Sequence, residues 1–115
     1  MALLIFSRPL GPALVFDLHG ALDSATAEKL QPRIDQALAD GHKVLIFDLH
    51  RLTFISSPGL SLFLGVFRRL RDSGSIRFVG LTPHVRRVFD ITGMTALLEL
   101  YGSVEDALVG PVPNA

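Results

Sequence analysis

Residues 43–60 read KVLIFDLHRLTFISSPGL, and this stretch decides the fold. Lys43 to Leu49 is a nearly continuous apolar run, typical of a β-strand that is buried on both faces of a sheet. Ser57 and Pro58 then mark a helix start, because serine caps free N–H groups and proline is tolerated at the first helical position. A buried strand that leads into a helix indicates an α/β domain with a parallel sheet.

The flanking sequence continues this alternation of strands and helices. We expect strands at 3–6, 13–19, 43–49, 75–81 and 97–101, and helices at 23–39, 57–72, 82–93 and from 103. The first helix, capped by Asp23 or Ser24, should bend or shorten at Pro32. A turn at 8–12 makes the first strand antiparallel to the second. The prediction is a single-layer, mostly parallel sheet of about five strands packed by about four helices, with residues 1–110 as one domain and 111–115 as a flexible tail.

Composition excludes several classes of function. The 115 residues include eleven Lys and Arg against eleven Asp and Glu, and this zero balance argues against nucleic-acid binding through the phosphate backbone. Cysteine is absent, which removes disulfides, thiolate metal sites and a cysteine nucleophile. The N-terminus lacks the pattern of a signal peptide, and no apolar run approaches the ~20 residues that span a bilayer. We expect a cytoplasmic protein without membrane insertion.

Candidate catalytic and metal-binding residues are few. The histidines His19, His42, His50 and His84 do not have the spacing of metal ligands. Asp17–His19 and Asp48–His50 end similar strands, so a metal site there is one alternative, with half-exposed strand-end histidines as the other. No phosphate-binding or nucleophile motif occurs. We therefore expect no enzyme activity, no cofactor and no metal.

The segment 52–60 is the most informative for function. It follows the buried strand, so it lies at the carboxyl edge of the sheet, where ligands gather in α/β domains. Ser57 is explained by helix capping alone, yet a phosphate there would be held by free N–H groups and would add negative charge to the surface. The following helix is apolar on two faces, which indicates either burial by a neighbouring helix or an exposed patch that binds another protein.

Several motifs, taken in order, resemble those of the STAS domain family. Residues 18–27, LHGALDSATA, look like its G-x-L-D-x-x-T-A signature, and 44–49 with 52–60 resemble its central strand and phosphorylation loop. Residues 78–89, 92–94 and 103–108 are similar to its later strand and its last helices. Small members of this family are typically anti-sigma factor antagonists.

The resemblance implies a partner switch. The unmodified protein would bind an anti-sigma serine kinase; phosphorylation of the loop serine would weaken the complex, and a serine phosphatase would reset it. Ser57 matches the phosphoacceptor, with Ser56 as the less favoured position, and Asp23 matches an acidic residue near the partner surface. The implied partner-binding residues are Asp23, Ser56, Ser57, Pro58, Gly59, Leu60, Ser61 and Leu64.

The loop departs from the family pattern. Relatives commonly have Asp-Ser-Ser/Thr-Gly-Leu, whereas this chain has Ser56-Ser57-Pro58-Gly59-Leu60. The altered loop leaves open an alternative in which the chain is a non-phosphorylated accessory subunit of an ABC lipid transporter or a signalling assembly. Homodimer formation is also left open.

Overall fold

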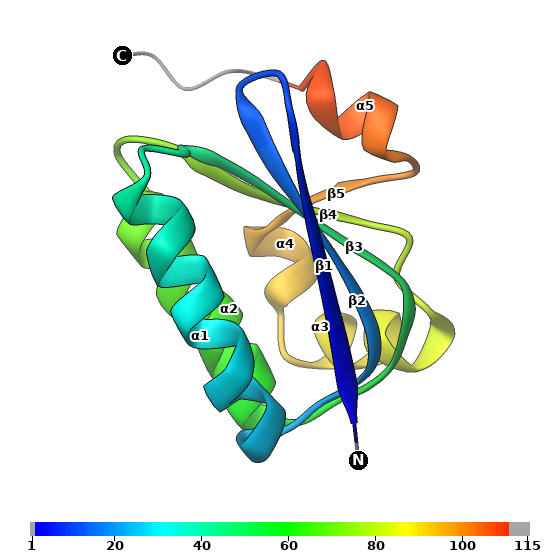
Figure 1. Cartoon of the computed structure of the whole chain (residues 1–115). Coiled ribbons are helices and arrows are strands. Elements are labelled where there is room, and N and C mark those ends of the chain that lie inside the picture. Colours follow the sequence, from blue (N-terminus) through cyan, green and yellow to red (C-terminus); the bar gives the residue numbers. More distant parts are fainter. Residues whose placement is uncertain (1, 111–115) are drawn as a thin grey trace.

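The computed structural model describes residues 2–110, which form five strands and five helices (Figure 1). In chain order these are β1 (Leu3–Leu10), β2 (Ala13–Leu22), α1 (Ser24–Ala39), β3 (Val44–Ile55), α2 (Ser57–Leu70), β4 (Ser75–Val79), α3 (Pro83–Ile91), α4 (Met94–Leu97), β5 (Glu99–Tyr101) and α5 (Val104–Leu108). The predicted tail at 111–115 lies outside the described residues. Within residues 2–110 no helix has the length and apolar character needed to cross a membrane.

The strands lie in the order β1-β2-β3-β4-β5. β1 runs antiparallel to β2, and the other three neighbouring pairs are parallel. This arrangement confirms the predicted mostly parallel sheet with an antiparallel first strand. Because β2 and β3 end together, with Leu22 opposite Ile55, the segments that follow them meet at one edge of the sheet.

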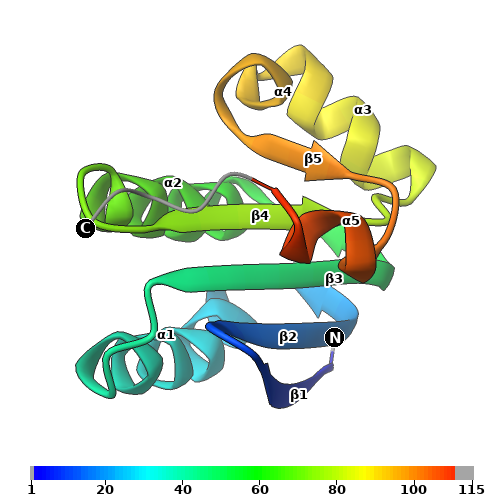
Figure 2. The same cartoon turned by 90° about the horizontal axis from the view of Figure 1, so that it is seen from above.

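Apolar side chains fill both faces of the sheet, but unequally. The larger core lies under α1, α2 and α3, where Phe47 of the central strand stacks with Phe16 and Phe78 at ring-centroid distances of 5.2 and 5.7 Å. A smaller core on the other face lies under α5 (Figure 2). Arg77, which is buried in β4, holds α5 in place because its Nη1 donates to the carbonyl oxygen of Ala107 at 2.6 Å.

Three strands are longer than the sequence predicts. β2 continues past the predicted end at His19 to Leu22. β1 continues past Phe6 to Leu10, because an edge strand tolerates Pro9 where the missing N–H faces away from its neighbour. β3 continues past the predicted end at Leu49 to Ile55, where its last residues pair with the end of β2. The strand was predicted from a continuous apolar run, and the polar residues in this part of β3 interrupt that run.

Two helices also differ from expectation. α1 runs unbroken over Ser24–Ala39 although Pro32 lies inside it, since the proline is on the exposed side, where water can replace the lost hydrogen bond. Met94–Leu97 forms an additional short helix, so the last strand starts at Glu99 rather than Leu97. The structure therefore has five helices among the described residues where about four were predicted.

Candidate partner-binding site

The candidate site lies where β3 passes into α2. The N–H of Ser56 donates to the carbonyl oxygen of Leu22 at 2.9 Å, which holds Ser56 in an extended conformation. The carbonyl oxygen of Ser56 accepts from the N–H of Leu60 at 3.0 Å, so Ser56 closes the first turn of α2. The helix cap is therefore Ser56, and the prediction that Ser57 caps the helix with Pro58 first in it is wrong by one residue. The cap lies at Ser56 because the Ser56 N–H is bonded to Leu22 at the end of β2, and this contact cannot be seen in the local sequence pattern.

The two adjacent serines differ in access to solvent. The Ser56 hydroxyl is buried, makes no hydrogen bond, and does not cap the helix N–H groups. Ser57 is exposed as the first residue of α2. Of the two hydroxyls, only that of Ser57 is open to another protein.

Pro58 and Gly59 complete the first turn. Pro58 occupies an early helical position and has no N–H to offer a bound phosphate. Gly59 is buried, and a Cβ there would lie 2.9 Å from both the Leu22 carbonyl oxygen and the Ile55 Cγ1. Glycine is thus required because α2 begins directly against the ends of β2 and β3.

A shallow groove beside Ser57 runs along α2. It is lined by Ser57, Leu60, Ser61, Leu64, Thr92 and Met94. Four of these residues are among the implied partner-binding set. Thr92 and Met94, from the α3–α4 junction, were not in that set, although 92–94 was one of the segments that carried the family resemblance. The structure thus adds a second wall to the predicted surface.

The two apolar faces of α2 have different roles. Leu62, Phe63, Val66 and Leu70 are buried in the larger core, so the neighbouring-helix alternative holds for Leu62 and Val66. Leu60 and Leu64 are only half-buried and line the groove. Leu60 and Leu64 therefore leave apolar surface partly exposed on a different face of α2 from the one formed by Leu62 and Val66.

Asp23 lies at the same sheet edge but has a structural role of its own. It is the N-cap of α1: its Oδ1 accepts from the Thr26 N–H at 3.0 Å, and its own N–H donates to the Thr26 Oγ1 at 2.8 Å. The hydrogen bond from the Thr26 N–H lowers the pKa of the Asp23 carboxyl below its ordinary value. Asp23 does not line the groove, but it directly follows Leu22, whose carbonyl oxygen binds the Ser56 N–H.

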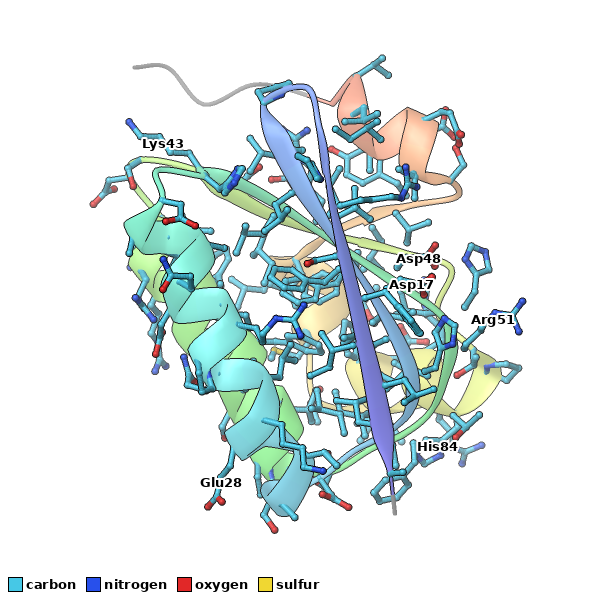
Figure 3. The ribbon with its side chains drawn as sticks, in the orientation of Figure 1. Asp17, Glu28, Lys43, Asp48, Arg51 and His84 are labelled. Carbon is cyan, nitrogen blue, oxygen red and sulfur yellow. The ribbon has the colours of Figure 1, made fainter. Side chains whose placement is uncertain are left out.

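His19 and His50 lie within β2 and β3, not at the strand ends where the sequence placed them, because these strands continue to Leu22 and Ile55. His19 Nε2 lies 3.0 Å from Asp17 Oδ1, and His50 Nδ1 lies 2.6 Å from Asp48 Oδ1, so each histidine contacts the aspartate of its own strand. Asp17 and Asp48 are register partners and lie close together in Figure 3. Nevertheless, no group of three or more ligating side chains in the described part of the chain could hold a metal ion.

Comparisons with known proteins agree with this arrangement. The family model for the STAS domain matches residues 8–107. The chain is 37% identical over 95 residues to the "Putative anti-sigma factor antagonist BtrV" of Bordetella bronchiseptica, with 82% of each chain covered. It is also similar to SpoIIAA, an anti-sigma factor antagonist solved in its unphosphorylated form (TM-score 0.79, 27% identity, 91% of this chain and 93% of that chain covered). The phosphorylated form of SpoIIAA, from Bacillus, gives a TM-score of 0.72 at 26% identity, with 91% of this chain and 96% of that chain covered. Because the family model matches most of the chain, the protein belongs to the STAS domain family.

Proposed function

We propose that this protein is an anti-sigma factor antagonist that acts as a phosphorylation-controlled binding partner. The observation that carries the proposal is the exposed Ser57 hydroxyl at the start of α2, directly beside the groove lined by Leu60, Leu64 and Met94. The names of the relatives support the antagonist role, and their partners are anti-sigma factors by those names. The proposed partner is an anti-sigma factor with serine kinase activity.

The partner would bind to the apolar surface of the groove. Leu60 and Leu64 present half-buried surface that a partner side chain could cover, and Ser57 and Ser61 add hydroxyl groups at the rim. Such a surface gains free energy from burial of apolar area while the hydroxyls fix orientation. The protein contributes shape and contact surface here, and the proposed role is binding rather than catalysis.

Phosphorylation would take place at Ser57. In the step, the Ser57 Oγ forms a bond to the γ-phosphorus of ATP, the bond to the β-phosphate oxygen breaks, ADP leaves, and the hydroxyl proton passes to a base of the kinase. The product carries about −1.5 to −2 charges at the groove. The α2 N-terminus favours this charge electrostatically, so the domain should stay folded while the partner surface changes. A serine phosphatase would then restore the hydroxyl.

Ser56 fits this role less well. Its hydroxyl is buried next to the end of β2, and phosphorylation there would require the first turn of α2 to open. Pro58 removes one N–H that could have held a phosphate, but it does not cover Ser57. The loop of this chain therefore keeps the acceptor that the proposal requires.

The experiment is incubation with the cognate kinase-type anti-sigma factor and ATP, followed by intact mass measurement. Wild type and Ser56→Ala should each gain one phosphoryl group, and Ser57→Ala should gain none. Ser57→Asp should weaken kinase binding by roughly tenfold or more while the far-ultraviolet circular dichroism spectrum is unchanged. Phosphate on neither serine, together with equal kinase binding by Ser57→Asp and wild type, would overturn the proposal. Such a result would favour a permanent docking role, for example as an accessory subunit of a transporter.

A further inference from the structure

The outer edge of β1 is open in the described structure. β1 is the first strand of the sheet, and beyond it lies no other element of residues 2–110 (Figure 2). Leu4 and Phe6, which are 58% and 52% exposed, are the exposed large apolar residues of this strand. Within β1 the only charged side chain is Arg8, so the edge has little of the charge that usually prevents strand pairing.

The direction of the β1 backbone groups follows from one hydrogen bond. The carbonyl oxygen of Ala2 accepts from the Ala21 N–H at 3.1 Å, so the groups of Ala2 point toward β2. Because this direction alternates along an antiparallel strand, the backbone groups of Leu3, Ile5 and Ser7 point outward. The backbone groups of Pro9 also point outward. The N–H that proline lacks would therefore not have bonded to β2.

We propose that β1 pairs antiparallel with β1 of a second copy of this chain, with the two Ile5 residues opposite each other on a twofold axis. In this register Leu3 lies opposite Ser7 of the other copy, and each such pair exchanges two backbone hydrogen bonds. Leu4 lies opposite Phe6 of the other copy, at the closer type of strand pair, where side chains pack best. The two five-stranded sheets join into one continuous sheet.

Self-complementarity favours a second copy as the occupant. The twofold register covers both exposed apolar residues of each copy with the other kind, and it places Arg8 opposite Ala2, so no like charges meet. A shift of two residues in one direction brings Leu4 opposite Arg8 and puts the N–H-deficient Pro9 into the ladder. The opposite shift leaves Phe6 beside Ala2. The register centred on Ile5 therefore pairs the residues of β1 better than either neighbouring register does.

This interface is separate from the proposed kinase surface. β1 and β5 are opposite edges of the sheet, and the groove lies between α2 and the α3–α4 junction. The groove residues take no part in the strand pairing, so the dimer can carry two partners at once. The inference does not depend on Ser57 being phosphorylated.

Cysteine cross-linking tests the register directly, since the chain has no cysteine of its own. In the proposed dimer the two Cα atoms at position 5 are about 5.5 Å apart, within the range of a disulfide. Ile5→Cys should therefore form a disulfide dimer under mild oxidation at a low concentration. Ser7→Cys is the matched control, because position 7 pairs with position 3 and two cysteines there lie too far apart. Equal cross-linking of both variants, or none by Ile5→Cys, would overturn the register.

Sedimentation equilibrium of the unmodified chain tests the dimer itself. The interface is small, so we expect a weak dimer whose average mass rises toward twice the monomer mass with concentration. Ile5→Pro removes an outward N–H without removing a bond to β2 and should weaken dimer formation by roughly tenfold or more. Ile5→Ala keeps that N–H and should retain dimer formation more fully. A wild-type chain that stays monomeric over the whole concentration range overturns the proposal, even if another protein adds a strand to this edge.

Discussion

Ser56 and Ser57 are neighbours in the chain, yet one hydroxyl is buried without a hydrogen-bond partner and the other is exposed at the start of α2. The Ser56 N–H is bonded to the Leu22 carbonyl oxygen, so Ser56 lies against the end of β2. Two chemically identical side chains, one residue apart, therefore differ in their exposure to solvent.

The contrast between two helix caps gives a stability prediction. Ser56→Ala should change the free energy of unfolding by less than about 0.5 kcal/mol, because the hydroxyl makes no hydrogen bond. Asp23→Ala should be clearly more destabilising, because Asp23 accepts the Thr26 N–H in a complete capping box. Urea denaturation of both variants measures the difference. Equal loss in the two variants would show that Ser56 has a capping role after all.

The two glycines of α2 should respond oppositely to alanine. Gly59→Ala should destabilise the fold by about 1–3 kcal/mol, because the added methyl group meets the Leu22 carbonyl oxygen and Ile55. Gly65→Ala should stabilise it by about 0.5–1 kcal/mol, since a methyl group at position 65 meets no atom within 4 Å and alanine is the better helix former. Thermal unfolding of the two variants checks this. A stable Gly59→Ala variant would mean that α2 can move away from β2.

The groove should be distinguishable from the dimer edge by two matched substitutions. Leu64→Ser should weaken binding to the anti-sigma partner by roughly tenfold, because it removes half-buried apolar surface from the groove. Leu4→Ser makes the same chemical change on β1 and should leave partner binding intact while it weakens dimer formation. Isothermal titration calorimetry and sedimentation measure the two effects. A loss of partner binding in Leu4→Ser would show that the partner contacts β1 rather than the groove.

Acid should destabilise the fold partly through Asp23. The hydrogen bond from the Thr26 N–H lowers the folded-state pKa of Asp23 below the ordinary value of 3.8. The stability that it contributes is therefore present above pH 3.8 and is lost as the pH falls through the lower, folded-state pKa. Asp23→Asn keeps a capping oxygen without a titrating group, so its denaturation midpoint should fall less steeply between pH 5 and acid than that of wild type. If the denaturation midpoints of the two proteins fell equally steeply with pH, this prediction would be contradicted.

The fold was largely predictable from the sequence because local patterns carry it. The apolar run at Lys43–Leu49 indicated a central buried strand, and the alternation of strands with helices indicated a parallel sheet. Asp23 was one of two predicted caps, and the structure confirms it. Ser57, Leu60, Ser61 and Leu64 were in the site implied by the family resemblance, and the structure brings them together along one groove.

Other features required the three-dimensional arrangement. The helix boundary at Ser56 depends on the carbonyl oxygen of Leu22, which is 34 positions away along the chain and comes close only when β2 and β3 end together. The second wall of the groove comes from Thr92 and Met94, and the uncovered edge of β1 is seen only when the strand order is known.

The sequence by itself determined the order of elements other than the short helix α4, because periodicity, caps and turns act over a few residues. The tertiary structure alone decided which serine is reachable, which face of α2 stays open and which strand lies at the edge. The reason is that solvent access depends on every segment packed around a side chain, and most of those segments are distant in sequence.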